Sequence, residues 1–226
     1  MRLAVPPGVF RPRSDSWLLA RWVRAEVRPG AAVADVCTGS GLLAVTAAVA
    51  GAGTVAAVDV SRRAVVAARV NARLNGVRVR ALRGDLLEPL DAESFDLVVS
   101  NPPYVPASTD ELPAAGPARA WDAGRDGRAL LDRICSQAPA RLRPGGAVLL
   151  VHSNVADADR TLSLLRDRGL TADVVERAPG PLGPLLRERR AALERRGLLN
   201  PAAAGEELLV IRGWLPAAAS RRAGLG

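Results

Sequence analysis

The tetrapeptide Asn101-Pro102-Pro103-Tyr104 carries the most specific chemistry in this sequence. It directly follows an apolar run that ends at Ser100, which predicts that a buried strand delivers it to the edge of a sheet. The two prolines fix the backbone and remove donors, so the Asn101 side-chain carbonyl and the Pro102 carbonyl are free to accept hydrogen bonds. Two convergent acceptors match the two protons of an NH2 group. Tyr104, the only tyrosine in the protein, offers a flat face to a planar amide or base.

A glycine turn in the segment Asp35–Gly41 is the second candidate site. Glycines let the backbone approach a ligand closely, and Asp59 closes the next expected strand, where a carboxylate can hold ribose hydroxyls. The third glycine of a dinucleotide fingerprint is missing, because Gly39 and Gly41 are followed by Ala44, and there is no Walker sequence. The motif therefore favours S-adenosylmethionine over NAD, with a purely structural turn as the alternative.

Together, the two segments favour methyl transfer to a planar nitrogen. Such a nitrogen delocalises its lone pair and is a weak nucleophile. Acceptors on both of its protons keep the lone pair aimed at the methyl donor and favour the developing positive charge. We expect the rate to come from positioning and electrostatics, without a strong base.

The elements around these motifs alternate regularly between strands and helices. Strands separated by helices of this length predict parallel βαβ units, with the last two strands pairing antiparallel at one edge. Ser14 or Asp15 is expected to cap the first helix. The expected strands are 33–37, 54–59, 77–82, 95–99, 147–151, 171–176 and 207–212, and the expected helices are 15–27, 42–50, 61–74, 127–142 and 156–168.

Composition excludes several classes of protein. Of 226 residues, 31 are basic, all of them arginine, and 23 are acidic, which gives a net charge of +8. This charge suits either an acidic partner such as nucleic acid or an ordinary solvated surface. Two cysteines, Cys37 and Cys135, supply neither a disulfide framework nor a zinc site, and the single His152 excludes a multi-histidine metal site. We expect no metal, and we expect His152 at the rim of the pocket.

The chain is expected to form one domain over residues 1–213, opened by an N-terminal helix segment over 1–30. The Pro- and Arg-rich stretch 178–204 is read as a short basic helix or a mobile insertion, either solvated or a binding arm, and 214–226 as a flexible tail. The N-terminus lacks a signal peptide pattern, and the apolar stretch 41–60 is better explained by a helix, turn and strand than by a membrane span. These features predict a cytoplasmic protein.

At this point the sequence resembles the class I S-adenosylmethionine-dependent methyltransferases, which have a Rossmann-like, seven-stranded, mostly parallel sheet with helices on both faces and an antiparallel edge strand. Within them it resembles the HemK family of protein-glutamine N5-methyltransferases, in the short form without an N-terminal helical domain. The resemblance covers about residues 9–177 and resumes at the last strand. It rests on 10–19, Asp35–Gly41, Asp59, Gly84-Asp85, Asn101–Tyr104 and 120–128.

The resemblance implies a role for each matching residue. The methionine part of the cofactor would be held by Asp35, Cys37, Thr38, Gly39, Ser40 and Gly41, the ribose by Asp59, and adenine by Asp85 and Leu86, with Ser16 near the cofactor. The substrate amide would be held by Asn101, Pro102, Pro103 and Tyr104, with Asn101, Pro102 and Tyr104 catalytic and Asn101 also at the cofactor. The implied substrate is the glutamine of the Gly-Gly-Gln loop of a peptide-chain release factor. A small zinc-binding activator protein is an implied partner.

Three alternatives stay open on the sequence alone. The same motif suits adenine N6 methylation of DNA or RNA, although no target-recognition domain is evident. It also suits methylation of a small molecule, or a protein that binds the cofactor without catalysis. Trp17 and Trp121 either line the pocket or simply pack.

Overall fold

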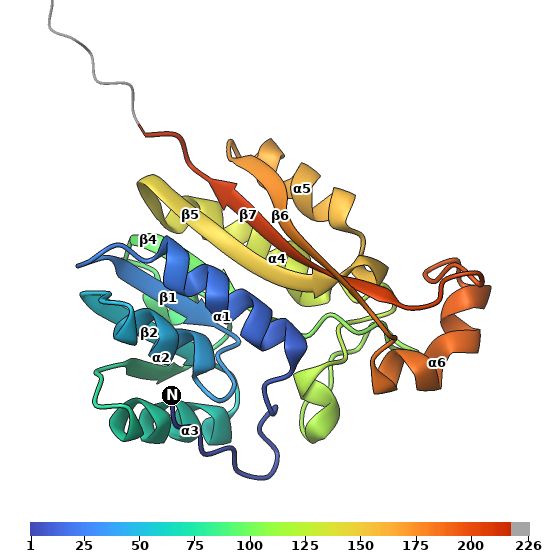
Figure 1. Ribbon diagram of the computed structural model, residues 1–226, viewed down its shortest axis with the longest axis horizontal. Helices are drawn as coiled ribbons and strands as arrows, with labels where there is room; N and C mark the ends of the chain where they lie inside the picture. The colour runs from blue at the N-terminus through green and yellow to red at the C-terminus, as the bar shows by residue number, and fades with distance from the viewer. Residues whose placement is uncertain (218–226) are drawn as a thin grey trace, which may run out of the picture.

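Seven strands form one sheet in the order β3-β2-β1-β4-β5-β7-β6 in the computed structural model, which describes residues 1–217 (Figure 1). The strands β3, β2, β1, β4 and β5 are parallel, and β7 pairs antiparallel with both β5 and β6. The expected Rossmann-like sheet and its antiparallel pair at one edge are confirmed, with the reversed strand β7 lying one place inside the edge. The strands are β1 (Ala32–Val36), β2 (Thr54–Asp59), β3 (Arg80–Arg83), β4 (Phe95–Ser100), β5 (Leu142–Ser153), β6 (Thr171–Gly180) and β7 (Glu206–Trp214).

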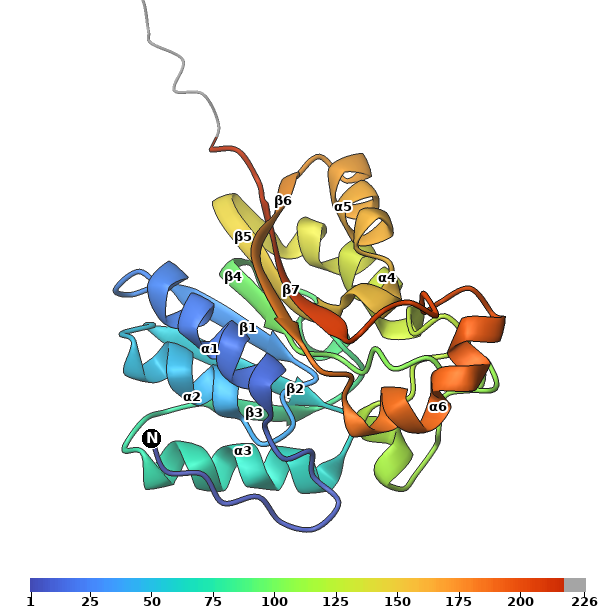
Figure 2. The same cartoon turned by 45° about the vertical axis from the view of Figure 1, so that its right-hand side comes forward.

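Helices cover both faces of the sheet, because side chains alternate along each strand. Val33 faces a core shared with α1, α2 and α3, whereas its neighbour Ala34 faces a second core shared with α4 and α5. The sixth helix, α6, lies beyond the ends of the strands (Figure 2). The helices are α1 (Ser14–Glu26), α2 (Leu42–Val49), α3 (Arg62–Leu74), α4 (Ala129–Gln137), α5 (Ala158–Asp167) and α6 (Pro184–Arg195).

The register of the central strands brings their carboxyl ends to one edge. Val36 at the end of β1 is paired with Ser100 at the end of β4 and with Val58 near the end of β2. The Ser100 hydroxyl also donates to the Val36 carbonyl at 2.7 Å. The two chemical motifs therefore leave neighbouring strands at the same level of the sheet.

Several expected boundaries are wrong for identifiable reasons. The helix expected over 127–142 ends at Gln137, and the short 3-10 turn Ala138–Arg141, with Pro139 near its start, follows it. The turn expected at 144–146 lies inside the long strand β5. The strand β6 runs on to Gly180 because β7 extends far enough to pair with it, and β3 begins at Arg80, later than expected.

The start of α1 also differs from expectation. Arg13 is the N-cap residue, and no side chain caps the helix, so neither Ser14 nor Asp15 has the expected role. At the other end of the chain, Trp214 belongs to β7, and residues 218–226 of the expected tail lie outside the described residues. Within residues 1–217, no helix is long and apolar enough to cross a membrane.

Candidate functional site

A cavity of about 850 Å³ opens at the carboxyl ends of β1, β2 and β4. The glycine turn and the loop after β4 both line this cavity. Both candidate motifs therefore border the same space, which neither motif alone could show. The sequence-predicted residues that line the cavity are Ser16, Cys37, Thr38, Gly39, Ser40, Asp59, Asp85, Leu86, Asn101, Pro102, Pro103 and Tyr104.

Asp35 lies beneath the glycine turn and does not line the cavity. It is fully buried in β1, and its Oδ2 accepts hydrogen bonds from the Thr38 hydroxyl at 2.5 Å and the Ala44 amide at 3.0 Å. Burial raises the pKa of Asp35 to about 7. In the structure, Asp35 therefore holds the turn through Oδ2, whereas its buried Oδ1 has no hydrogen-bond partner among the described residues.

Gly41 does not line the cavity either, and a steric constraint requires glycine at this position. Its φ is +81°, in the left-handed region, and an added Cβ would lie 2.8 Å from the Cα of Ala68 in α3. Only glycine allows α2 to start this close to α3. Cys37, at φ +58°, does line the cavity, but burial and the nearby Asp59 raise the pKa of its thiol, so it stays protonated.

Asp59 joins the turn to the end of β2. Its Oδ2 accepts from the Gly39 amide at 2.9 Å, and its Oδ1 accepts from the Ser61 amide at 2.8 Å. Burial raises the pKa of this carboxyl group. Each carboxylate oxygen has a second lone pair, so Asp59 can accept further hydrogen bonds from hydroxyl groups in the cavity.

The third segment that the sequence predicts to hold the cofactor lies after β3. Asp85 forms an ion pair with Arg133 of α4 at 2.8 Å. Leu86 has a φ of +48°, an unusual value for a residue with a side chain, and its side chain is buried. The turn, Asp59 and this segment all line the same cavity, so groups from the ends of three neighbouring strands are available to one ligand.

The segment Asn101–Tyr104, named the acceptor motif because it is expected to hold the methyl acceptor, is held by hydrogen bonds to the first turn of α1. The Asn101 side-chain amide donates to the Ser16 hydroxyl at 2.9 Å, and the Tyr104 hydroxyl donates to Asp15 at 3.0 Å. Burial, followed by the charge of Asp15, raises the pKa of Tyr104 well above its usual value, so the side chain stays a phenol. Sequence reasoning missed Asp15 in this role. The available signal was an acidic residue directly before the predicted site residue Ser16.

The insertion forms the far wall of the cavity. Residues 178–187 line it, and the expected helix is present as α6. Buried Leu186 and Leu193 belong to a small apolar cluster that also contains Val105, just after the acceptor motif. Arg189 donates to the Pro106 carbonyl at 2.8 Å and to Asp122 at 2.6 Å. The insertion is therefore docked on the acceptor loop.

Three further residues singled out in the sequence are placed by the structure. His152 is not at the pocket rim as expected, because its ring is buried and pairs with the Thr161 hydroxyl at 3.0 Å. Burial lowers the pKa of His152 to about 4, so the ring is neutral near pH 7. Trp121 lines the cavity, whereas Trp17 is 46% exposed and does not.

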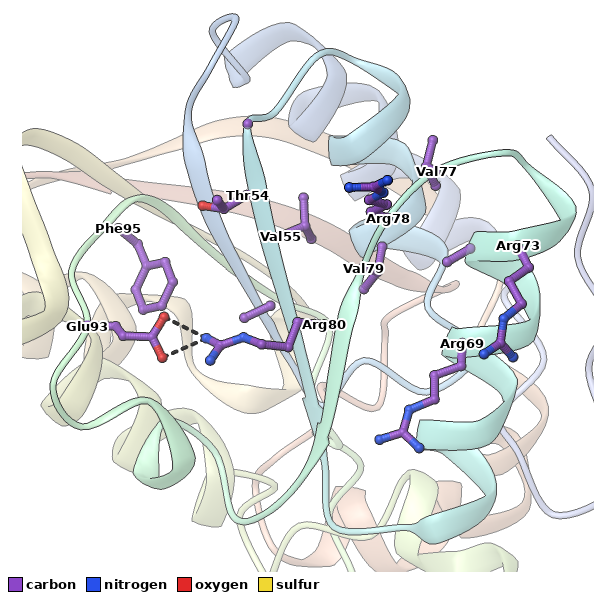
Figure 3. Close-up of a pocket in the computed structure, with 13 residues that line it drawn as sticks. Thr54, Val55, Arg69, Arg73, Val77, Arg78, Val79, Arg80, Glu93 and Phe95 are labelled. Atoms are coloured by element: carbon purple, nitrogen blue, oxygen red, sulfur yellow. Dashed lines mark hydrogen bonds and ion pairs between the residues drawn. The ribbon is translucent and has the colours of Figure 1, made fainter.

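A second hollow of about 590 Å³ lies at the opposite, amino-terminal ends of β2 and β3 (Figure 3). Arg69 and Arg73 from α3 lie on one side of it, and Arg80 is paired with Glu93 at 2.5 Å. It contains none of the predicted site residues. Within residues 1–217, no cluster of histidine, cysteine or carboxylate side chains could hold a metal ion.

The sheet order, the glycine turn and the acceptor motif at one cavity define a class I methyltransferase. Comparison with known proteins agrees. Residues 2–115 match the family described as "Methyltransferase small domain". A Methanocaldococcus jannaschii protein, provisionally named as a protein N5-glutamine methyltransferase, is 32% identical over 82% of this chain and 93% of its own length.

A bacterial relative supports the same family. The release factor glutamine methyltransferase of Bordetella pertussis is 41% identical over 74% of this chain, which spans 64% of that relative's length. The chain belongs to the HemK family of protein-glutamine N5-methyltransferases. It is an S-adenosylmethionine-dependent enzyme.

Solved structures share the fold. The ribosomal protein L11 methylase of Lactobacillus delbrueckii superposes with a TM-score of 0.58 at 24% identity, covering 92% of this chain and 82% of its own. The E. cuniculi Mtq2–Trm112 complex, which methylates the translation termination factor eRF1, gives a TM-score of 0.60 at 22% identity over 92% and 99%. At these identities the likeness concerns the fold.

Proposed function

We propose that this enzyme methylates the side-chain amide of the glutamine in the Gly-Gly-Gln loop of a peptide-chain release factor. The observation that carries the proposal is the position of Asn101 on the same cavity as the glycine turn. The names of the Bordetella pertussis, Geobacter sulfurreducens and Mycolicibacterium smegmatis relatives support this substrate. The chain spans 60–65% of the length of these three relatives.

The cofactor half of the site would hold the methyl donor. Cys37–Ser40, Asp59, Asp85 and Leu86 all line the cavity, and Asp85 and Leu86 would flank the adenine. Bound S-adenosylmethionine supplies the methyl group from its sulfonium. Asp35 and Gly41 support the turn from outside the cavity and complete this half.

The acceptor half would orient the glutamine amide. Asn101 uses its NH2 group on Ser16, which leaves its carbonyl oxygen to accept from the substrate NH2. The Pro102 carbonyl would accept the second proton, with Pro103 stiffening the turn and Tyr104 lying against the planar amide. The nitrogen–carbon bond forms as the sulfur–carbon bond breaks, and the amide nitrogen then loses a proton to water.

The geometry supports catalysis by orientation without a general base. Tyr104 stays a phenol because its pKa is raised, and His152 lies away from the cavity. Convergent acceptors stabilise the positive charge that develops on the nitrogen in the transition state. Such preorganised groups cost no reorganisation when the reaction occurs.

We further propose that the enzyme acts in the cytoplasm, where release factors act, and with a small zinc-binding activator protein. The support for the activator is the resemblance of residues 10–19 to the short form of the family and the fold shared with the Mtq2–Trm112 complex. Co-expression with such a protein is expected to raise the soluble yield and the turnover. An equal turnover with and without it would remove this part of the proposal.

The proposed substrate is tested by incubating the purified enzyme with radiolabelled S-adenosylmethionine and three acceptors in parallel. These are a release factor, the same factor with its Gly-Gly-Gln glutamine changed to alanine, and total nucleic acid. We expect label in the first only. Label in nucleic acid, or equal label in both release factors, would contradict the proposal.

A further inference from the structure

Asp15 is a buried carboxylate at the start of α1 that no cofactor role explains. It is 5% exposed, and its two oxygens face two different side chains. Oδ1 accepts from the Ser16 hydroxyl at 3.0 Å, and Oδ2 accepts from the Tyr104 hydroxyl at 3.0 Å. Because Ser16 in turn accepts from Asn101 at 2.9 Å, Asp15 is connected to both polar side chains of the acceptor motif.

The direction of these hydrogen bonds is fixed by chemistry. An ionised carboxylate can only accept, so Ser16 and Tyr104 must both donate to Asp15. The Ser16 proton is then committed, and the Ser16 oxygen can only accept from Asn101. Asn101 must therefore present its NH2 group to Ser16 and keep its carbonyl oxygen for the cavity. Without the carboxylate, the Asn101 amide could turn over and offer donors to a substrate that needs acceptors.

We propose that Asp15 is a positioning residue that sets the orientation of the Asn101 amide through Ser16 and the position of the Tyr104 ring directly. The inference rests on the proposed function for the reaction it assists. The hydrogen-bond network itself concerns only residues of this chain. Asp15 does not have to touch the substrate for this role.

The single tyrosine of the protein gives a readout that needs no acceptor. Every tyrosinate signal in an ultraviolet pH titration comes from Tyr104. The charged groups that face it are Asp15 and Arg13 at the start of α1 and Glu206 in β7. In the wild type we expect ionisation well above the usual value, since burial and Asp15 both oppose the negative charge.

Asp15→Asn removes the charge with little change in shape. We expect the titration midpoint of Tyr104 to fall by about one pH unit. Glu206→Gln removes a charge that makes no hydrogen bond to Tyr104, and we expect a smaller fall. Circular dichroism at each pH restricts the comparison to folded protein. An identical midpoint in the wild type and Asp15→Asn would overturn the proposal.

Kinetics test the link to Asn101. We expect Asp15→Asn to lower kcat by about 10- to 100-fold, with the Kd for S-adenosylmethionine changed less than about threefold. Ser16→Ala interrupts the branch to Asn101 and should lower kcat without moving the Tyr104 midpoint. The exposed Asp167→Asn is the matched control, with wild-type kcat and thermal stability.

A double-mutant cycle separates positioning from a general loss of stability. If Asp15 acts only through Ser16 and Tyr104, its substitution should matter little once both are changed. Adding Asp15→Asn to the Ser16→Ala/Tyr104→Phe variant should then lower kcat by less than about threefold. Full additivity, or a wild-type kcat in Asp15→Asn, would overturn the proposal. If the wild type fails to label a release factor, the proposed function fails, while the tyrosine titration still decides whether Asp15 holds Tyr104.

Discussion

The two halves of the cavity are built in different ways. In the cofactor half, the supporting hydrogen bonds join residues close in the chain: Ala44 to Asp35 is nine residues apart and Gly39 to Asp59 is 20. In the acceptor half, Asn101 and Ser16 are 85 residues apart, and Tyr104 and Asp15 are 89 apart. The glycine turn with Asp35 and Asp59 is a property of one βαβ unit. The acceptor half exists only after the whole domain has folded.

The segments that would hold the cofactor are therefore different from the segments that would select the substrate. The turn and its two flanking strands are fixed by local geometry that any chain with this motif must satisfy. The acceptor half brings together α1, the loop after β4 and the insertion around α6, and residues of all three segments line the cavity. Changes in those distant segments can alter the acceptor without disturbing the methyl donor.

The largest expected effect separates the two halves directly. Asn101→Ala removes the side-chain acceptor for the substrate amide, and we expect kcat to fall by about 100- to 1,000-fold. Because the glycine turn and Asp59 are untouched, binding of S-adenosylmethionine measured by calorimetry should change little. If the variant keeps more than a tenth of the wild-type rate, the Asn101 carbonyl is not the hydrogen-bond acceptor that orients the substrate amide.

The next largest effect concerns the stability of the cofactor half. Gly41→Ala would force a Cβ against the backbone of Ala68 at a positive φ, and we expect a loss of about 2–3 kcal/mol in the free energy of unfolding. Gly76→Ala is the control, since Gly76 also has a positive φ but no atom within 4 Å, and should cost about 1 kcal/mol. Equal losses in urea denaturation would mean that the contact with α3 is unimportant.

A smaller effect concerns the docking of the insertion. Arg189→Ala removes the hydrogen bonds to Pro106 and Asp122, and we expect KM for the protein acceptor to rise about five- to tenfold while kcat changes less. Arg195→Ala, on an exposed position of the same helix, is the control. If both variants match the wild type, the insertion only covers the cavity and does not select the acceptor.

The smallest effect is on stability against pH. The raised pKa of Asp35 contributes stability below pH 3.8 that is lost as the pH rises through about 7. The lowered pKa of His152 contributes stability above pH 6.5 that is lost as the pH falls through about 4. The two trends oppose each other. Asp35→Asn should therefore make stability rise more steeply between pH 4 and 6.5 than in the wild type in denaturant titrations, and equal slopes would exclude the Asp35 contribution.

The same contrast explains what the sequence could predict. The Asp35–Gly41 turn, Asp59 and the Asn101 motif follow apolar strands, so their placement at one sheet edge follows from strand period and chain order. The sequence predicts Ser14 or Asp15 as a helix cap because both precede the helical pattern. The partner of Asp15, Tyr104, lies 89 residues away, and no local pattern reveals such a pair. His152 was placed at the rim because it ends a strand, whereas α5 covers it. Asp35 looked like a ligand, and its full burial was not evident from its position in a strand.

The most direct test of the account is the position of the methyl group. After reaction of the enzyme with S-adenosylmethionine and an unmodified release factor, tandem mass spectrometry of the peptide that contains Gly-Gly-Gln reads the modified atom. We predict one added methyl on the side-chain nitrogen of that glutamine, formed about 100- to 1,000-fold more slowly when Asn101→Ala replaces the wild-type enzyme. A methyl group on any other residue of the factor, or the same product formed by Asn101→Ala at the wild-type rate, would contradict the proposal that this cavity orients a glutamine amide.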